Sequence, residues 1–160
     1  MLRKLVLTAF LISLAFGLGE TSVWAATEAP HDPALIEAII ADVAVGWETA
    51  DGAPFRQHFL DFPGARYVES GGQNSSLQDL IENHVEPEGD ALAELTLDFS
   101  EIDVNFEDGF AWAIASVRVK ATIKSDGRKI DKKGYETFLF RDVEGTWRVV
   151  HTHSSTRSVK

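Results

Sequence analysis

Two histidines close to the C-terminus are the residues whose type and spacing most clearly suggest chemistry. They lie in the segment Trp147-Arg148-Val149-Val150-His151-Thr152-His153-Ser154-Ser155. Because alternate side chains of a strand point to one face, we expect a common face for Trp147, Val149, His151 and His153. Two residues of strand rise would separate the histidine Cα atoms by about 6 to 7 Å. Imidazole exchanges protons near neutral pH and binds transition metals, so this face is a candidate catalytic or metal site.

Two further residues are expected to join these histidines. His84 follows Leu77, Leu80 and Ile81 at helical spacing, which places it on the inward side of a helix. A set of His84, His151 and His153 is suited to Zn²⁺ or Cu²⁺. Glu136, on the preceding strand, is expected as a fourth ligand or as an acceptor that fixes a histidine tautomer. The same histidines and Glu136 are also suited to acid–base catalysis without a metal.

A purely structural interpretation of the histidines stays open. A histidine at the end of a strand is often a half-buried residue with one hydrogen-bond partner, and His84 can cap its own helix near Pro87.

Composition excludes some partners. The chain has 160 residues, which fits one domain, and a formal charge of −10 with a pI near 4.9. Nucleic acid and anionic membrane surfaces would be repelled by this charge. With no cysteine, the chain forms no disulfide and carries no lipidated cysteine.

The N-terminal segment predicts export. A basic start at Met1-Leu2-Arg3-Lys4 precedes an apolar run over 5–18, and Val23-Trp24-Ala25 fits a cleavage site. A membrane anchor is the alternative, but the run is shorter than the ~20 residues that span a bilayer. We therefore predict a signal peptide over 1–25 and one secreted or periplasmic domain over 26–160, without membrane contact after cleavage.

The remaining pattern predicts an α+β domain. Helices are expected over 33–50, 54–60 and from Ser75 or Ser76 to just before Pro87, with one short strand over 65–70. Four long strands follow in hairpin succession, over 95–106, 110–123, 129–142 and 146–157. A change of alternation between Phe99 and Ile102 predicts a β-bulge, which bends a strand. We expect a curved antiparallel sheet wrapped around about three N-terminal helices.

This arrangement resembles the SnoaL-like and DUF4440 branch of the nuclear transport factor 2 (NTF2-like) superfamily, the cone-shaped fold shared with ketosteroid isomerase. The resemblance covers nearly all of the mature chain and is most specific at 67–72, 136–139 and 147–155. It implies a pocket between the sheet and the helices, and a homodimer through the exposed face of the sheet. Members include cyclases, isomerases and dehydratases. The expected pocket residues are Tyr67, Glu69, Trp112, Arg118, Phe138 and Trp147.

Three functions remain open from the sequence. The first is an exported protein that binds a small molecule or a divalent metal in a histidine-lined cone. The second is an isomerase-like, cyclase-like or dehydratase-like enzyme that uses His151, His153 or Glu136 as acid and base. A third possibility is a dimer that serves mainly as an interaction module. The sequence identifies no substrate.

Overall fold

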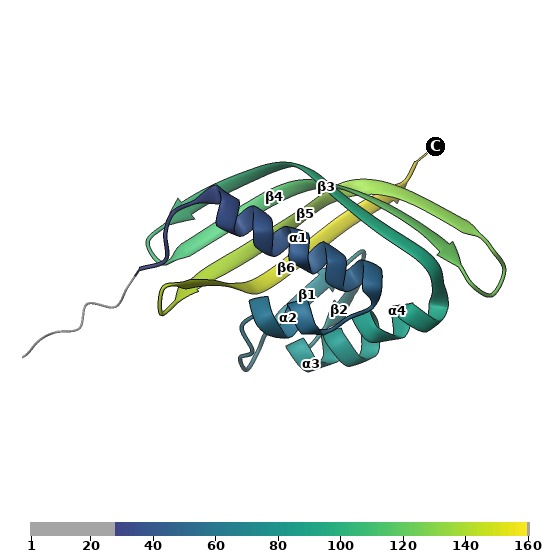
Figure 1. Cartoon of the computed structure of the whole chain (residues 1–160), viewed down its shortest axis with the longest axis horizontal. Helices are drawn as coiled ribbons and strands as arrows, with labels where there is room; N and C mark the ends of the chain where they lie inside the picture. The colour runs from purple at the N-terminus through teal and green to yellow at the C-terminus, as the bar shows by residue number, and fades with distance from the viewer. Residues whose placement is uncertain (1–27, 160) are drawn as a thin grey trace, which may run out of the picture.

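The chain forms a curved six-stranded sheet whose concave side is covered by helices (Figure 1). The computed structural model describes residues 28–159. The helical elements are α1 (Pro33–Thr49), α2 (Ala53–His58), α3 (Leu77–Leu80), the π-helical turn η1 (Ile81–Val85) and α4 (Glu86–Ala91). The strands are β1 (Arg66–Glu69), β2 (Gly72–Asn74), β3 (Leu92–Glu107), β4 (Phe110–Ile123), β5 (Lys129–Val143) and β6 (Thr146–Ser158). The predicted α+β class and the four long strands are confirmed.

Helix α1 begins and ends with the signals that the sequence contains. The Asp32 side chain accepts a hydrogen bond from the backbone N–H of Ala34 at 3.0 Å, and Pro33 occupies the first turn, where its missing N–H costs nothing. Ala50 ends the helix in a left-handed conformation with φ 52°. The buried stripe of α1 lies on the sheet and consists of Ile36, Ile39, Ile40, Val43 and Gly46.

The third helical segment is longer than predicted, because Pro87 does not end it. The N–H of Glu86 donates to the carbonyl of Ile81, five residues earlier, which defines the wide turn of a π-helix. This turn interrupts the regular helical hydrogen bonds just before Pro87. Proline has no backbone N–H, so it could not donate a helical hydrogen bond at this position. The helix therefore continues as α4 to Ala91.

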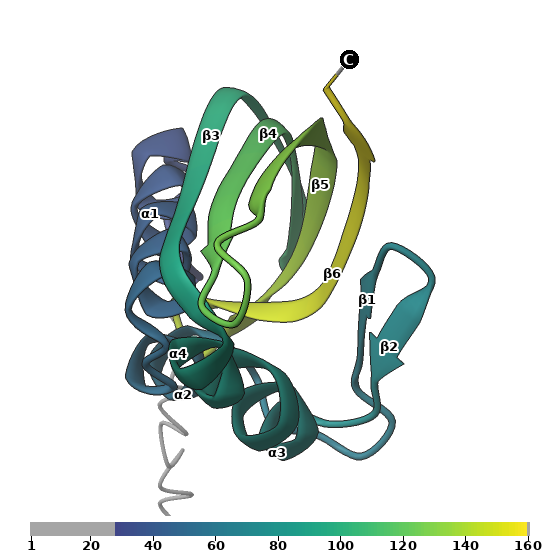
Figure 2. The same cartoon turned by 90° about the vertical axis from the view of Figure 1, so that its right-hand side faces the viewer.

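The strand order of the sheet is β2-β1-β6-β5-β4-β3. The long strands pair as antiparallel hairpins, whereas β1 joins β6 in parallel, so the sheet is mixed at that edge. The predicted bulge in β3 is confirmed by a register shift between Ser100 and Asp103, where Glu101 has φ 50°. Figure 2 shows the resulting trough, with α3 and α4 at one end and the β1–β2 hairpin beyond β6.

The core lies between α1 and the concave face of β4, β5 and β6. Small side chains at Ala111 and Ala113 let the helix approach the sheet closely, as the predicted small-residue face requires. The fully buried larger side chains of this core include Ile36, Ile40, Phe138, Phe140 and Val149. This dense packing holds one end of the sheet closed and leaves the other end available for a cavity.

Gly134 marks a close approach of the backbones of β5 and β6, and replacing it should destabilise the fold. A Cβ atom at this position would lie 1.9 Å from the carbonyl oxygen of Ser155. We expect Gly134→Ala to lower the free energy of unfolding by about 3 kcal/mol, because backbone atoms would have to separate. Denaturant unfolding measures this loss. Gly72→Ala is the control, since its nearest contact would be 3.4 Å, and an equally stable Gly134→Ala variant would contradict the prediction.

The convex face of the sheet carries several apolar side chains, among them Ile114 and Tyr135, which are 42% and 64% exposed. The homodimer predicted through this face concerns a second copy of the chain and stays a prediction. The predicted signal peptide over 1–25 lies outside the described residues. Within 28–159, no helix is long and apolar enough to cross a membrane.

Candidate functional site

A β-bulge in β6 decides which side chains face the concave side. Leu139 pairs with His151 but Phe140 pairs with Val149, so Val150 is an extra residue in β6. One extra residue moves every later side chain to the opposite face. Before the bulge Trp147 and Val149 point inward, and after it Thr152, Ser154 and Thr156 do. The prediction that Trp147, Val149, His151 and His153 share one face is therefore wrong.

The two C-terminal histidines lie on the other face of β6. His153 is exposed, and the Nδ1 atom of His151 lies 2.6 Å from the backbone oxygen of Arg66 on the neighbouring strand. They therefore do not converge with His84, which faces the concave side. Among residues 28–159, no three histidine, aspartate or glutamate side chains lie close enough to hold a metal ion. The predicted three-histidine arrangement is not formed.

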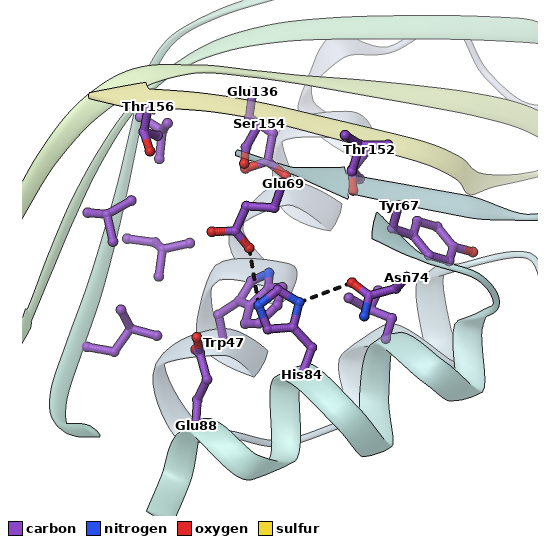
Figure 3. Close-up of a pocket in the computed structure, with 16 residues that line it drawn as sticks. Trp47, Tyr67, Glu69, Asn74, His84, Glu88, Glu136, Thr152, Ser154 and Thr156 are labelled. Atoms are coloured by element: carbon purple, nitrogen blue, oxygen red, sulfur yellow. Dashed lines mark hydrogen bonds and ion pairs between the residues drawn. The ribbon is translucent and has the colours of Figure 1, made fainter. Parts of the chain in front are cut away.

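A cavity lies instead under the other end of β6, between the sheet and the helical segment α3–η1–α4. Its empty volume is about 610 Å³, open mouth included. One wall is apolar and comes from β3 and β4, and the opposite side is polar (Figure 3). The apolar wall consists of Leu95, Leu97, Val117 and Val119, and the polar lining includes Glu69, Asn74, His84, Glu88, Glu136, Thr152, Ser154 and Thr156.

His84 is the most completely positioned titratable side chain in this cavity. It projects from η1, and its Nδ1 atom lies 3.0 Å from Asn74 Oδ1 on β2. Its Nε2 atom lies 3.3 Å from Glu69 Oε2 on β1. The ring also stands edge-on to Trp47 of α1, with centroids 4.9 Å apart. Four elements therefore fix one imidazole, and Figure 3 shows both polar contacts.

These contacts assign a role to each ring nitrogen. An amide oxygen only accepts hydrogen bonds, so Nδ1 of His84 donates to Asn74 and keeps its proton. Nε2 is then the nitrogen that can take up or release a proton. When Nε2 is protonated, the imidazolium forms an ion pair with the Glu69 carboxylate. The arrangement thus allows proton uptake at a single atom that borders the cavity.

Two other carboxyl groups of the cavity have unusually high pKa values. Burial, with a further contribution from the negative charge of Glu69, raises the pKa of Glu136 to about 8. The same two causes raise the pKa of Glu88 to about 7. Glu136 is therefore mostly protonated at neutral pH and Glu88 about half protonated, so the empty cavity holds much less negative charge than three carboxylates would give.

Tyr67 lines the cavity but directs its hydroxyl group away from His84 (Figure 3). Its side chain is 98% buried, given a relative exposure of 2%. Burial and the nearby charge of Asp61 raise its pKa to about 12. Within the described residues its hydroxyl has no hydrogen-bond partner. Tyr67 therefore serves mainly as an aromatic wall, packed against Phe59 with ring centroids 5.2 Å apart.

Four of the predicted pocket residues lie elsewhere. Trp112 and Arg118 belong to the convex face of β4, where Arg118 forms an ion pair with Asp131 at 2.7 Å. Phe138 is fully buried in the core next to the cavity. Trp147 lies near the other end of β6, and its Nε1 atom donates to the backbone oxygen of Pro30 at 2.9 Å. Tyr67, Glu69, His84 and Glu136 are the predicted site residues that the fold does bring together.

Sequence reasoning missed several residues of the cavity. Glu88 was not predicted, because Pro87 suggested the end of a helix. Glu88 nevertheless lies four residues after His84, a spacing that would place both side chains on one helical face. Asn74 follows Gly71-Gly72, a pair that suggests a turn rather than a strand. The inward hydroxyl groups of Thr152, Ser154 and Thr156 depend on the bulge at Val150, for which the sequence offers no clear signal.

Comparison with known proteins identifies the family. The sequence profile of the SnoaL-like domain matches residues 36–158, and the chain belongs to this family. The structure is similar to an NTF2-like superfamily protein from Salmonella enterica serovar Typhimurium, with a TM-score of 0.69, 19% identity, and coverage of 77% of this chain and 87% of that one. These matches confirm the NTF2-like cone that the sequence predicted.

Two other solved structures show the same fold. A hexachlorocyclohexane dehydrochlorinase, LinA-type3, from Novosphingobium barchaimii has a TM-score of 0.65 and 15% identity, and the match covers 79% of this chain and 85% of that one. A protein with a cystatin-like fold from Caulobacter vibrioides has a TM-score of 0.64 and 20% identity, with coverage of 80% and 89%. No curated protein matches the sequence. At these identities the likeness concerns the fold alone.

Proposed function

We propose that the chain binds a small molecule in the cavity and transfers a proton on it, with His84 as the general base. The observation that carries this proposal is the fixed environment of His84 at the cavity. Asn74 holds the proton on Nδ1 at 3.0 Å, and Glu69 lies 3.3 Å from Nε2. A general base needs a nitrogen that the reacting molecule can approach, here Nε2 beside Glu69, and a group that stabilises the imidazolium it forms.

The proposed step follows from these contacts. Nε2 of neutral His84 removes a proton from a carbon or oxygen atom of the bound molecule, and the electron pair of the broken bond stays on that molecule. The imidazolium is stabilised by the Glu69 carboxylate and by the hydrogen bond to Asn74. The proton then returns to another atom of the same molecule, which isomerises it, or it passes to water while a group leaves.

The rest of the lining is suited to holding such a molecule. Leu95, Leu97, Val117 and Val119 offer apolar surface for a hydrocarbon part, and three hydroxyl groups of β6 offer hydrogen bonds to polar atoms. One relative of the same fold is named a dehydrochlorinase, so the fold is compatible with an enzyme. From the pattern of 1–25 alone, we further propose that the protein acts outside the cytoplasm.

Hydrogen–deuterium exchange tests this proposal without knowledge of the substrate. The chain is incubated in D₂O with small ketones, amino ketones and hydroxy ketones, and loss of carbon-bound proton signals is followed by NMR. We expect at least one compound to exchange faster than with the same concentration of free imidazole. Denatured chain is the control for exchange by exposed side chains. Exchange no faster than with imidazole for every compound would contradict proton transfer at this site.

A further inference from the structure

The charge of the cavity lining indicates what kind of molecule it receives. Three carboxyl groups, from Glu69 on β1, Glu88 on α4 and Glu136 on β5, border one space, and within residues 28–159 no lysine or arginine lines it. Figure 3 shows Glu69 and Glu88 directed into this space from opposite sides. The ionised carboxylates would repel an anionic ligand. The formal charge of −10 would also attract cations to the protein.

The three carboxyl groups differ in their charge partners. Glu69 forms an ion pair with His84, whereas in the part of the chain that the structure describes Glu88 and Glu136 have no ion-pair partner. The nearby Glu86, on the same helix as Glu88, points elsewhere and pairs with Arg56 at 3.2 Å. A partly buried carboxyl group without a partner is costly when ionised, so a positive charge brought by a ligand would be strongly favoured.

A bare metal ion does not fit this arrangement. Over residues 28–159, no three acidic or histidine side chains are close enough to chelate one. A larger cation with an apolar body fits better, because Leu95, Leu97, Val117 and Val119 line the same space. The indole of Trp47 also lines it and offers an aromatic surface that attracts organic cations.

We propose that the ligand of the cavity is an organic amine in its protonated form, with its ammonium group attracted by the carboxyl groups of Glu88 and Glu136 and its hydrocarbon part on the wall of β3 and β4. This inference rests on the proposed function, since it specifies the class of molecule bound at the same site. When the ammonium group binds, Glu88 and Glu136 ionise and release protons, because a neighbouring positive charge favours the carboxylate.

Calorimetric titration with three compounds of nearly equal size tests the inference. The probes are 2-phenylethylamine, 2-phenylethanol and phenylacetate, at pH 7 in two buffers of different ionisation enthalpy. We expect the amine to bind at least tenfold more tightly than the alcohol, with release of protons, and phenylacetate not to bind. Equal or tighter binding of the alcohol or of phenylacetate, or binding of none of the three, would overturn the inference.

Single substitutions locate the ammonium group. We expect Glu136→Gln and Glu88→Gln each to weaken amine binding at least tenfold and to reduce the proton release, while binding of the alcohol changes less than threefold. Glu86→Gln is the matched control and should bind the amine like the wild type, because Glu86 does not line the cavity. Unchanged amine binding in both Glu136→Gln and Glu88→Gln would contradict the assignment.

His84→Gln separates this inference from the proposed function. Its amine binding should be no weaker than that of the wild type, because the substitution leaves the carboxylate of Glu69 at the cavity without its histidine partner. Amine binding without any catalysed deuterium exchange would contradict proton transfer and support the amine site. Catalysed exchange of uncharged ketones without preference for amines would support proton transfer and contradict the amine site.

Discussion

His84→Gln is expected to reduce catalysed deuterium exchange by about 100- to 10,000-fold, the usual contribution of a general base. Glutamine keeps a hydrogen-bonding side chain of similar length next to Asn74, but it has no nitrogen that takes up a proton near neutral pH. Loss of exchange with retained folding would therefore report on the base itself. The measurement is the rate of proton loss by NMR for a compound that the wild type exchanges.

His58→Gln is the matched control for this prediction. His58 also forms a histidine–carboxylate pair, with Asp42 at 2.9 Å, but it lies outside the lining of the cavity. Its substitution should change the exchange rate by less than threefold. If His84→Gln kept a rate within threefold of the wild type, or if His58→Gln lost as much activity, His84 would not be the base.

Glu136→Gln is expected to stabilise the protein at alkaline pH. The pKa of Glu136 is about 8 in the folded chain, against an ordinary value of 4.5. Folding favours the protonated form of Glu136. Ionisation therefore lowers the free energy of unfolding as the pH rises from about 4.5 to 8, and this loss is complete above pH 8. The difference between the two pKa values limits this loss of unfolding free energy to about 5 kcal/mol. We expect about 2 kcal/mol, since water enters the open cavity.

Denaturant unfolding at pH 4 and pH 9 measures this effect. Glu136→Gln cannot ionise, so its free energy of unfolding should exceed that of the wild type at pH 9 and match it at pH 4. The control is Glu37→Gln, at an exposed position of α1, which should follow the wild type at both values. An equal difference between variant and wild type at the two pH values would show that Glu136 carries no elevated pKa.

The fold could be predicted because its main elements repeat a simple pattern. Helix α1 has a capping residue at Asp32 and an apolar stripe at helical spacing, and β4 alternates small inward residues with larger outward ones. Asp108-Gly109 defines the hairpin between β3 and β4. These signals are local, so a single sequence is enough to read them.

The site could be predicted only in part, because two irregularities control it. Val149 and Val150 are both apolar, so the alternation of β6 can be read in either phase, and the bulge at Val150 turned His151 and His153 outward. The π-helical turn carried the helix past Pro87 and added Glu88. The bulge depends on the pairing of β6 with β5, which a single sequence does not show. His84 follows Leu77, Leu80 and Ile81 at helical spacing and Glu136 alternates with Phe138 and Phe140, so the faces predicted for these two side chains are the ones that line the cavity.

The central claim is that the functional site lies in the cavity around His84 and not on the face of β6 that carries His151 and His153. Intermolecular nuclear Overhauser effects between the labelled chain and a compound that it exchanges test this claim most directly. We predict contacts from the compound to the ring of His84 and to the methyl groups of Leu97 and Val119. Contacts to His153 and Ile114, with none to His84, would contradict it.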